Sequence, residues 1–177
     1  MLTGLSPASW DLDEGLPDSL LWDPRVGAFR APALAYAALR RWVEGFPLDI
    51  MDLVDGWRRV PRPVFEPPEL RDYQREALWA WNRAQRRGII ALPTGSGKTR
   101  VALAAMAELG LPVVVLVPTK VLMAQWREEL AKVYAGEVGQ IGDGKYELRV
   151  VTVATFESAY RYMERFGSRF GLLVVDE

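Results

Sequence analysis

The segment 89–99, which reads IIALPTGSGKT, constrains the fold more than any other part of the chain. It joins an apolar run, 88–92, that predicts a strand to a stretch, 98–109, that predicts a helix. A glycine-rich turn in this context lets consecutive backbone N–H groups face a phosphate at the positive end of the helix dipole. The sequence therefore predicts a phosphate-binding loop (P-loop) in an α/β fold.

Each residue type in this loop has a defined use in binding ATP. Four consecutive residues are expected to present the loop backbone to the β- and γ-phosphates: Thr94, Gly95, Ser96 and Gly97. Lys98 would bring a positive charge to these phosphates, and Thr99 would offer a hydroxyl to Mg²⁺. Leu92 stands where the usual pattern begins with glycine. The alternative is a glycine-rich turn before an ordinary helix, which the flanking strand and helix disfavour.

A second acidic element follows another apolar run, because the segment 172–177 reads LLVVDE. Ligands of open α/β sheets lie beyond the carboxyl ends of the strands. We therefore expect Asp176 to hold Mg²⁺ and Glu177 to orient or deprotonate an attacking water, with Lys98 as the third catalytic residue. Alone, such a strand end is more often a polar exit than a catalytic pair, and the upstream P-loop favours the catalytic interpretation.

Helices and short apolar strands alternate through the second part of the chain, which is typical of a parallel sheet flanked by helices. Helices are predicted at 71–87, 98–109, 119–134 and 156–166, and strands at 88–92, 112–117, 147–154 and 172–175, with a glycine-rich turn at 139–145. This pattern predicts a nucleotide-binding α/β domain over residues 71–177.

The first part of the chain lacks this alternation and is rich in Pro, Trp and Arg. Turn-forming residues at 23–27 predict a hairpin, and Pro32 predicts the start of a helix that Gly45 ends. We interpret residues 1–62 as a small α+β domain and residues 63–70 as a proline-rich linker. Four tryptophans in this part are expected to pack in a core or between domains rather than to stack on bases: Trp10, Trp22, Trp42 and Trp57.

Composition excludes several kinds of chemistry. The chain has no Cys and no His, so disulfides, Cys/His zinc sites, Cys nucleophiles and Ser-His-Asp triads are ruled out. The net charge of −1 offers no general basic field, so any contact with nucleic acid must be local. No apolar run approaches the roughly 20 residues of a membrane helix, and no signal peptide is evident. A cytoplasmic protein without a membrane partner is expected.

With these motifs placed, residues 70–177 resemble superfamily 2 DExH helicases and translocases, most closely the XPB/Rad25-like branch. The stretch 70–74 is similar to the Q motif, in which Arg71 and Gln74 would contact the nucleotide and the Gln74 amide would read the adenine edge. The alternative for Gln74 is a solvated residue of a helix. The stretch 92–99 is similar to motif I, where the leucine variant is familiar in this branch. The stretch 174–177 is similar to the start of motif II. The resemblance implies a RecA-like P-loop NTPase domain that uses ATP and Mg²⁺.

The same resemblance implies a DNA-contacting side. The stretch 117–126 is similar to motif Ia, and 139–145 and 152–155 are similar to the next motifs. The residues expected at the DNA backbone are Pro118, Thr119, Lys120 and Thr155. Physical alternatives remain open, because both threonines precede helices and could be N-caps, and Lys120 could be a solvated first-turn cation. Residues 22–33 resemble the segment before the Q motif, within a domain associated with damaged DNA.

Members of this family hydrolyse ATP between two RecA-like domains, the second of which supplies arginine fingers. The chain contains only the first of these and ends at Glu177, within motif II. The expected parent is an ATP-dependent DNA helicase or translocase in repair, acting on single-stranded or forked DNA with a nuclease or repair partner. The 177-residue piece is expected to bind Mg·ATP without efficient hydrolysis. The alternatives are a non-catalytic nucleotide- or DNA-binding module and the motor part of a restriction system.

Overall fold

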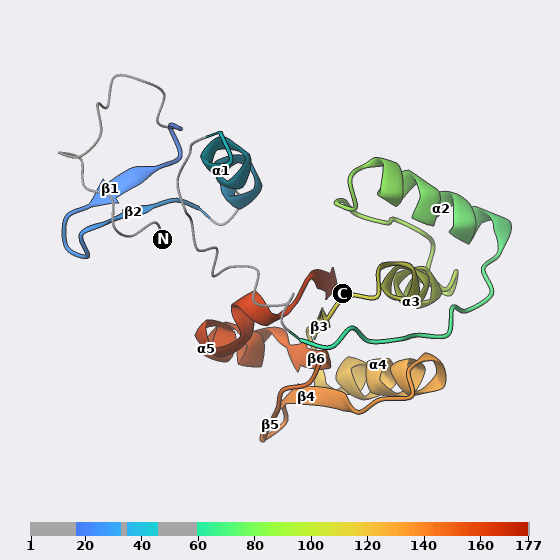
Figure 1. Cartoon of the computed structure of the whole chain (residues 1–177). Coiled ribbons are helices and arrows are strands. Elements are labelled where there is room, and N and C mark those ends of the chain that lie inside the picture. The colour runs from blue at the N-terminus through green and yellow to red at the C-terminus, as the bar shows by residue number, and fades with distance from the viewer. Residues whose placement is uncertain (1–16, 33–34, 46–59, 177) are drawn as a thin grey trace. The chain divides into compact units, whose positions relative to one another are not determined.

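The structure is a computed structural model that describes residues 17–32, 35–45 and 60–176. The chain divides into two compact units, Met1–Met51 and Asp52–Glu177 (Figure 1). Three residues with predicted roles lie outside the described residues: Trp10, Trp57 and Glu177. Within the described segments, no helix has the length and hydropathy of a membrane span.

The first unit contains the predicted hairpin. Its strands β1 (Leu21–Asp23) and β2 (Ala28–Arg30) are antiparallel, with Trp22 opposite Phe29. These two rings meet edge to face at 5.1 Å between centroids, which stabilises a cross-strand pair. The helix α1 (Tyr36–Val43) follows. The hairpin is confirmed, and Trp22 packs on a neighbouring ring as expected.

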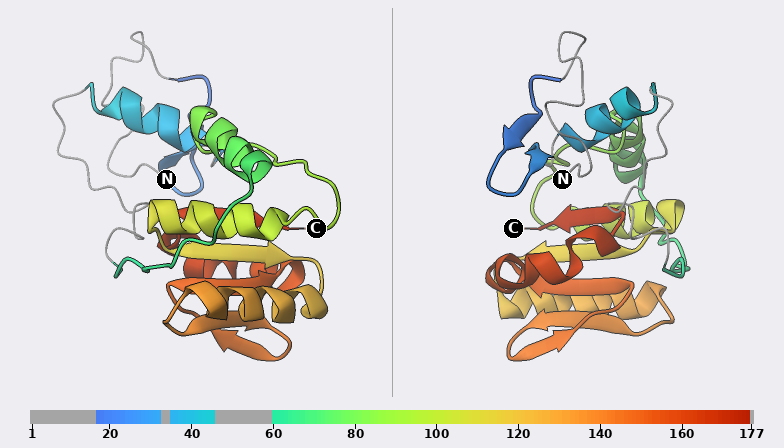
Figure 2. Two further views of the ribbon diagram at one scale, coloured as in Figure 1. Left: turned by 90° about the vertical axis from the view of Figure 1, so that its right-hand side faces the viewer. Right: turned by 60° about the vertical axis from the view of Figure 1, so that its left-hand side comes forward.

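The second unit is built on a five-stranded sheet in the order β5-β4-β6-β3-β7. Its strands are β3 (Val113–Val117), β4 (Val138–Gly142), β5 (Lys145–Glu147), β6 (Val151–Thr155) and β7 (Leu172–Val175). All neighbours are parallel except β4 and β5. Figure 2 shows β7 and β5 at opposite edges of the sheet. The parallel-dominated sheet with helices on it confirms the predicted α/β fold.

Helices cover both faces of this sheet. They are α2 (Asp72–Arg83), α3 (Lys98–Leu109), α4 (Lys120–Val133) and α5 (Phe156–Phe166), the last followed by the 3-10 turn η4 (Gly167–Arg169). The helices α3 and α4 lie on one face of the sheet and α5 lies on the other (Figures 1 and 2). The helix α2 packs against α3. The predicted helices at 98–109, 119–134 and 156–166 are thus confirmed to within one residue at each end.

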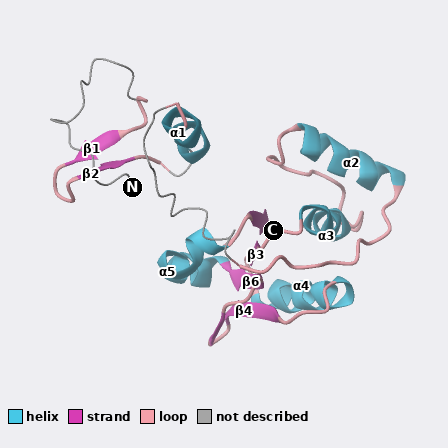
Figure 3. Cartoon of the chain, in the orientation of Figure 1, coloured by secondary structure: helices cyan, strands magenta, loops and turns pink. Residues whose placement is uncertain are grey.

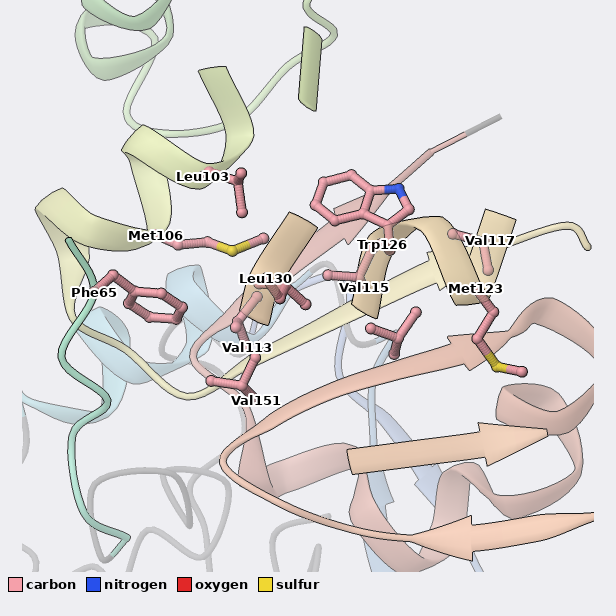
Figure 4. Close-up of a cluster of buried hydrophobic side chains, with 11 residues drawn as sticks. Phe65, Leu103, Met106, Val113, Val115, Val117, Met123, Trp126, Leu130 and Val151 are labelled. Carbon is pink, nitrogen blue, oxygen red and sulfur yellow. The ribbon is translucent and has the colours of Figure 1, made fainter. Parts of the chain in front are cut away.

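Alternation along the strands separates two apolar clusters. Val113, Val115 and Val117 face α3 and α4, whereas Leu116 packs on the α5 side. Such alternation follows from the two-residue period of a strand. The larger cluster is shown in Figure 4 and contains Phe65, Leu103, Met106, Val113, Val115, Val117, Met123, Trp126, Leu130, Val151 and Val153. It ties both helices to the sheet.

Several local predictions are wrong. The helix predicted at 71–87 is α2, which already ends at Arg83, and the strand predicted at 147–154 is β6, which begins only at Val151. Residues 88–92 form no strand, and Figure 3 shows the connection from α2 to α3 as loop. An apolar run becomes a strand only where a neighbour accepts its backbone hydrogen bonds, and no strand of the described residues pairs with this run. The turn predicted at 139–145 is instead the hairpin β4–β5, because only Asp143 and Gly144, with φ of +53° and +75°, are needed for the reversal.

The proline-rich segment 61–68 packs on the second unit. Phe65 is 7% exposed, and its ring lies 5.1 Å from that of Tyr134. The main-chain N–H of Glu66 donates to the carbonyl oxygen of Val133 at 2.8 Å. The prolines keep this segment extended, and Phe65 is a member of the core cluster described above.

Candidate functional site

The P-loop ends in the first turn of α3. Gly95 and Gly97 have φ of +76° and +79°, a left-handed conformation that side chains with a Cβ rarely adopt. Gly97 is also the residue before the helix, and a Cβ placed on it would lie 2.7 Å from Nε2 of Gln74. The first N–H groups of a helix have no partner within the helix. The loop therefore presents backbone donors at the positive end of α3, as a phosphate site requires.

The side chains of the loop fit an anionic ligand. The Lys98 ammonium is exposed and donates to the carbonyl oxygen of Leu92 at 3.0 Å. The Ser96 hydroxyl is buried and has no hydrogen-bond partner among the described residues, which is costly for a polar group unless a ligand satisfies it. Thr99 is half-buried in the first turn of α3. Lys98 and Thr99 would hold the phosphates and Mg²⁺ of ATP, which supplies the phosphoryl group for hydrolysis.

Gln74 lies against the loop and is 2% exposed. Its Nε2 donates to the carbonyl oxygen of Ser96 at 2.7 Å, and its Oε1 accepts from the backbone N–H of Arg71 at 2.9 Å. The hydroxyl of Tyr73 donates to the same Ser96 oxygen at 2.8 Å. The start of α2 is thus bonded to the P-loop backbone, a role that the sequence did not predict. Contact of Arg71 and Gln74 with the nucleotide stays a prediction.

Asp176 follows the edge strand β7 and is held at two points. Its main-chain N–H donates to the carbonyl oxygen of Leu116 at 3.0 Å, and Nε1 of Trp126 donates to its Oδ2 at 2.6 Å. A carboxylate with one donor retains lone pairs for a cation. The described residues contain no group of three or more His, Cys, Asp or Glu that could hold a metal ion. A single carboxylate such as that of Asp176 suits Mg²⁺, which proteins often bind with one or two carboxylates together with nucleotide phosphates.

The residues predicted to contact DNA lie along the carboxyl ends of the parallel strands. Pro118 and Thr119 follow β3 and are exposed, and Thr155 ends β6. The Thr119 hydroxyl accepts from the backbone N–H of Leu122 at 3.2 Å, so the N-cap alternative is present in the structure. The Thr155 hydroxyl donates to the Ser158 hydroxyl at 3.0 Å. Whether these residues also contact DNA stays a prediction.

Lys120 and Asp143 form an ion pair at this edge. Their side chains meet at 2.6 Å although both are more than half exposed. Asp143 lies in the β4–β5 turn, so the pair spans from the end of β3 to the end of β4, across β6. The hydrogen bond from Lys120 lowers the pKa of Asp143, and that from Asp143 raises the pKa of Lys120. The sequence did not predict this partner for Lys120.

The P-loop and Asp176 lie at the same edge of the second unit. In Figure 2, α3 begins on the side where β3 ends, and the parallel β7 ends on that side too. The carboxyl edge therefore carries both the phosphate-binding turn and the acidic strand end. Trp126 was missed as a site residue because a tryptophan on the apolar face of a helix indicates core packing. The available signal was its indole N–H, because a buried indole N–H needs an acceptor and therefore indicates a polar neighbour.

Comparisons with known proteins agree with this geometry. Residues 67–177 match the family described as "Type III restriction enzyme, res subunit". Residues 5–54 match the "Xeroderma pigmentosum group B helicase damage recognition domain". The damage recognition match precedes the other match along the chain, which is the order of domains that the sequence resemblance implies.

Several curated proteins are similar to the chain. The "DNA 3'-5' translocase XPB2" of Sulfurisphaera tokodaii is 36% identical over 168 residues, covering 94% of this chain and 37% of that protein. The "DNA 3'-5' helicase XPB" of Mycobacterium tuberculosis is 35% identical over 148 residues, covering 75% of this chain and 26% of that protein. The protein of the same name from Kineococcus radiotolerans is 35% identical over 146 residues, covering 75% and 26%.

The chain thus spans 26% to 37% of the length of these relatives. Within that span, the P-loop, the stretch that precedes it and the acidic strand end stand where the resemblance places the motifs of superfamily 2. The chain belongs to the superfamily 2 DExH helicases and translocases, in their XPB/Rad25-like branch.

Proposed function

We propose that the chain is the ATP-binding part of an ATP-dependent DNA translocase or helicase that acts in DNA repair or processing. In this proposal, residues 71–177 form its first RecA-like domain and bind Mg·ATP. The observation that carries it is the P-loop turn, in which two left-handed glycines lead into α3 beside the exposed Lys98. The names of the relatives, which are DNA 3'-5' translocases and helicases, support DNA as the substrate.

The residues divide the work of binding and positioning. The loop backbone and Lys98 bind the phosphates, while Thr99 and Asp176 hold Mg²⁺ between the protein and the nucleotide. Glu177, which follows Asp176, would orient or deprotonate the attacking water. Lys98 must leave its Leu92 acceptor to reach a phosphate, an exchange that replaces a neutral acceptor by a charged one and is therefore favourable.

DNA is proposed to lie across the carboxyl edge, at Pro118, Thr119, Lys120 and Thr155. Exposed groups at strand ends suit contacts to the backbone of single-stranded or forked DNA, which position the strand without reading its sequence. Residues 1–62 are proposed to form a separate domain for distorted DNA, and their match to a damage recognition domain supports this. That match also favours a repair translocase over a restriction motor, although the second unit alone is similar to both.

Hydrolysis by the 177-residue chain is proposed to be slow. In this family ATP is cleaved between two RecA-like domains, and an arginine from the second domain accelerates hydrolysis about 10³–10⁵-fold. Besides the β1–β2 hairpin, the described residues form one sheet, the five-stranded and mostly parallel sheet of the second unit. A partner with repair or nuclease activity is part of the same proposal.

The test is calorimetric binding of a non-hydrolysable ATP analogue with Mg²⁺ to this chain and its Lys98→Ala variant. Loss of one charge-assisted hydrogen bond costs about 1.5–3 kcal/mol, which is roughly a 10–150-fold loss of affinity. Lys132→Ala is the matched control, because Lys132 is exposed and pairs with Glu129 within α4. Equal affinity in all three proteins would refute the site. Anisotropy with single-stranded and forked DNA tests the second half of the proposal.

A further inference from the structure

Trp126 connects the apolar core to the acidic strand end. The residue lies in α4, is 3% exposed and belongs to the cluster that joins α3 and α4 to the sheet. Figure 4 shows its indole ring among the labelled side chains of that cluster, with the nitrogen in blue. That nitrogen donates to Oδ2 of Asp176 across 2.6 Å. One side chain thus contacts both the core and the proposed metal ligand.

The carboxylate of Asp176 has few other constraints. Among the strands of the described residues, β7 lies at the edge of the sheet and pairs with β3 alone. The backbone of Asp176 is fixed by its bond to Leu116, but this bond leaves the side-chain torsions free. The side chain of a residue just beyond an edge strand would sample several rotamers in the absence of a further contact. The indole N–H supplies that contact.

The chemistry of the donor suits a permanent support. An indole N–H is a donor only, and it carries no charge that would compete with a cation. Its bond to Oδ2 leaves lone pairs on Oδ1 that can accept a metal ion. The ring is 3% exposed and belongs to the same buried cluster as Val115 and Leu130, and such packing restricts its rotamers. Groups that hydrogen-bond to metal-binding side chains typically change metal affinity about 10–100-fold when they are removed.

We infer that Trp126 is a positioning residue that orients the Asp176 carboxylate to bind the divalent cation of the metal–nucleotide complex. The inference rests on the proposed function, since it takes Asp176 as a metal ligand. It adds a residue of the motif Ia-like stretch to the metal site, through a contact that reaches from the middle of α4 to the end of β7. In this inference Trp126 acts through Asp176, so it is a positioning residue and not a catalytic one.

The experiment compares Trp126→Phe with the unchanged chain. Phenylalanine keeps an aromatic ring in the core and removes the N–H. Binding of Mn²⁺ in the presence of a non-hydrolysable ATP analogue is followed by electron paramagnetic resonance, and binding of the same analogue in EDTA is followed by calorimetry. We expect Mn²⁺ affinity to fall about 10-fold or more, while the affinity for metal-free nucleotide stays within about twofold. Unchanged Mn²⁺ affinity would overturn the inference.

A matched control separates positioning from packing. Leu130 is fully buried in the same helix and cluster, and Leu130→Ala leaves the indole N–H in place. We expect this variant to lower the thermal stability while Mn²⁺ affinity stays unchanged. A loss of Mn²⁺ affinity in Leu130→Ala equal to that in Trp126→Phe would assign the effect to packing and overturn the inference. If Trp126→Phe does not fold, 3-benzothienylalanine at position 126, which replaces the N–H by sulfur, keeps the ring size.

Asp176→Asn distinguishes failure of this inference from failure of the proposed function. If Asp176→Asn weakens Mn²⁺ binding and Trp126→Phe does not, Asp176 is a ligand and the positioning role alone is refuted. If neither variant changes Mn²⁺ binding, the metal assignment of Asp176 is refuted together with the inference. The double variant is expected to lose less than the sum of the single losses, because Trp126 acts on the metal only through the side chain of residue 176.

Discussion

The side-chain amide of Gln74 donates to the main-chain carbonyl oxygen of Ser96 across 2.7 Å, inside the P-loop. The same amide accepts from the backbone of Arg71, and it is 2% exposed. A residue that the sequence suggested as a reader of adenine is therefore also a brace between α2 and the phosphate-binding turn. The two roles predict different effects of a Gln74 substitution on the binding of nucleotides that lack adenine.

Gln74→Ala is expected to weaken binding of ATP, GTP and inorganic triphosphate to a similar extent. The substitution leaves the Arg71 N–H without its acceptor, at about 1–3 kcal/mol, and leaves Tyr73 as the remaining side-chain donor to the Ser96 oxygen. The loop therefore loses part of its support whatever the base. Calorimetric titration of the three ligands measures this, with exposed Gln125→Ala as the control. A loss confined to adenine nucleotides would contradict the bracing role and favour direct recognition of the base.

Gly97→Ala is expected to be more damaging than Gly95→Ala. Both glycines have positive φ, for which a side chain costs about 1 kcal/mol. A Cβ on Gly95 meets open space, whereas one on Gly97 would lie 2.7 Å from Nε2 of Gln74 and would displace that amide. Thermal unfolding and nucleotide titration of the two variants should show the greater loss at position 97. Equal losses would mean that Gln74 moves aside freely.

Asp143→Asn is expected to raise the affinity for single-stranded DNA about two- to fivefold at low salt. The Asp143 carboxylate pairs with Lys120 and would compete with a DNA phosphate for the same ammonium, but exposed pairs are weak, so the gain is small. Lys120→Ala should lower the affinity and reduce the slope of log K against log salt by about 0.7. Anisotropy over a salt series tests both, with Lys132→Ala as the control. An unchanged slope in Lys120→Ala would remove Lys120 from the DNA contacts.

Acid is expected to loosen the β1–β2 hairpin through Asp23. The guanidinium groups of Arg25 and Arg30 bond this carboxylate and hold its pKa well below the usual 3.8. A lowered folded-state pKa gives stability that is complete above the unfolded-state pKa and is lost as the pH falls through the folded value. Asp23→Asn should therefore be less stable at pH 6 and show a smaller further loss toward pH 2. Tryptophan fluorescence in urea at several pH values measures this, and parallel pH profiles of the two proteins would contradict it.

The elements that local patterns define could be predicted from the sequence. The helix at 98–109 begins after a left-handed glycine and ends at Gly110, which also has positive φ, so both boundaries follow from residue type. The strand 113–117 and the helix at 119–134 follow from apolar runs and the Thr119 cap. The P-loop could be predicted from the spacing of its residues and from its position before a helix.

The remaining features depend on partners that are distant along the chain. Residues 88–92 have the composition of a strand, but pairing decides whether a strand forms, and composition does not report it. The Trp126–Asp176 bond joins residues 50 positions apart, and the Gln74–Ser96 bond joins residues 22 apart. No periodic pattern encodes such contacts. The Lys120–Asp143 pair was hidden for the same reason, because it required the hairpin that was predicted as a turn.

The attachment of Phe65 has a mechanical consequence. At the C-terminal end of α4, the Phe65 ring packs on Tyr134 and the Glu66 N–H donates to the Val133 carbonyl oxygen. Thr119 caps the other end of that helix, at the carboxyl edge of the sheet. Tension applied to the chain at residue 60 would act first on the contacts of Phe65 and Glu66. These contacts lie at the edge of the sheet opposite to the proposed phosphate site. We therefore expect force arriving along the chain to act on these contacts before it acts on the P-loop. A recombinant second unit should begin upstream of Phe65 to retain them.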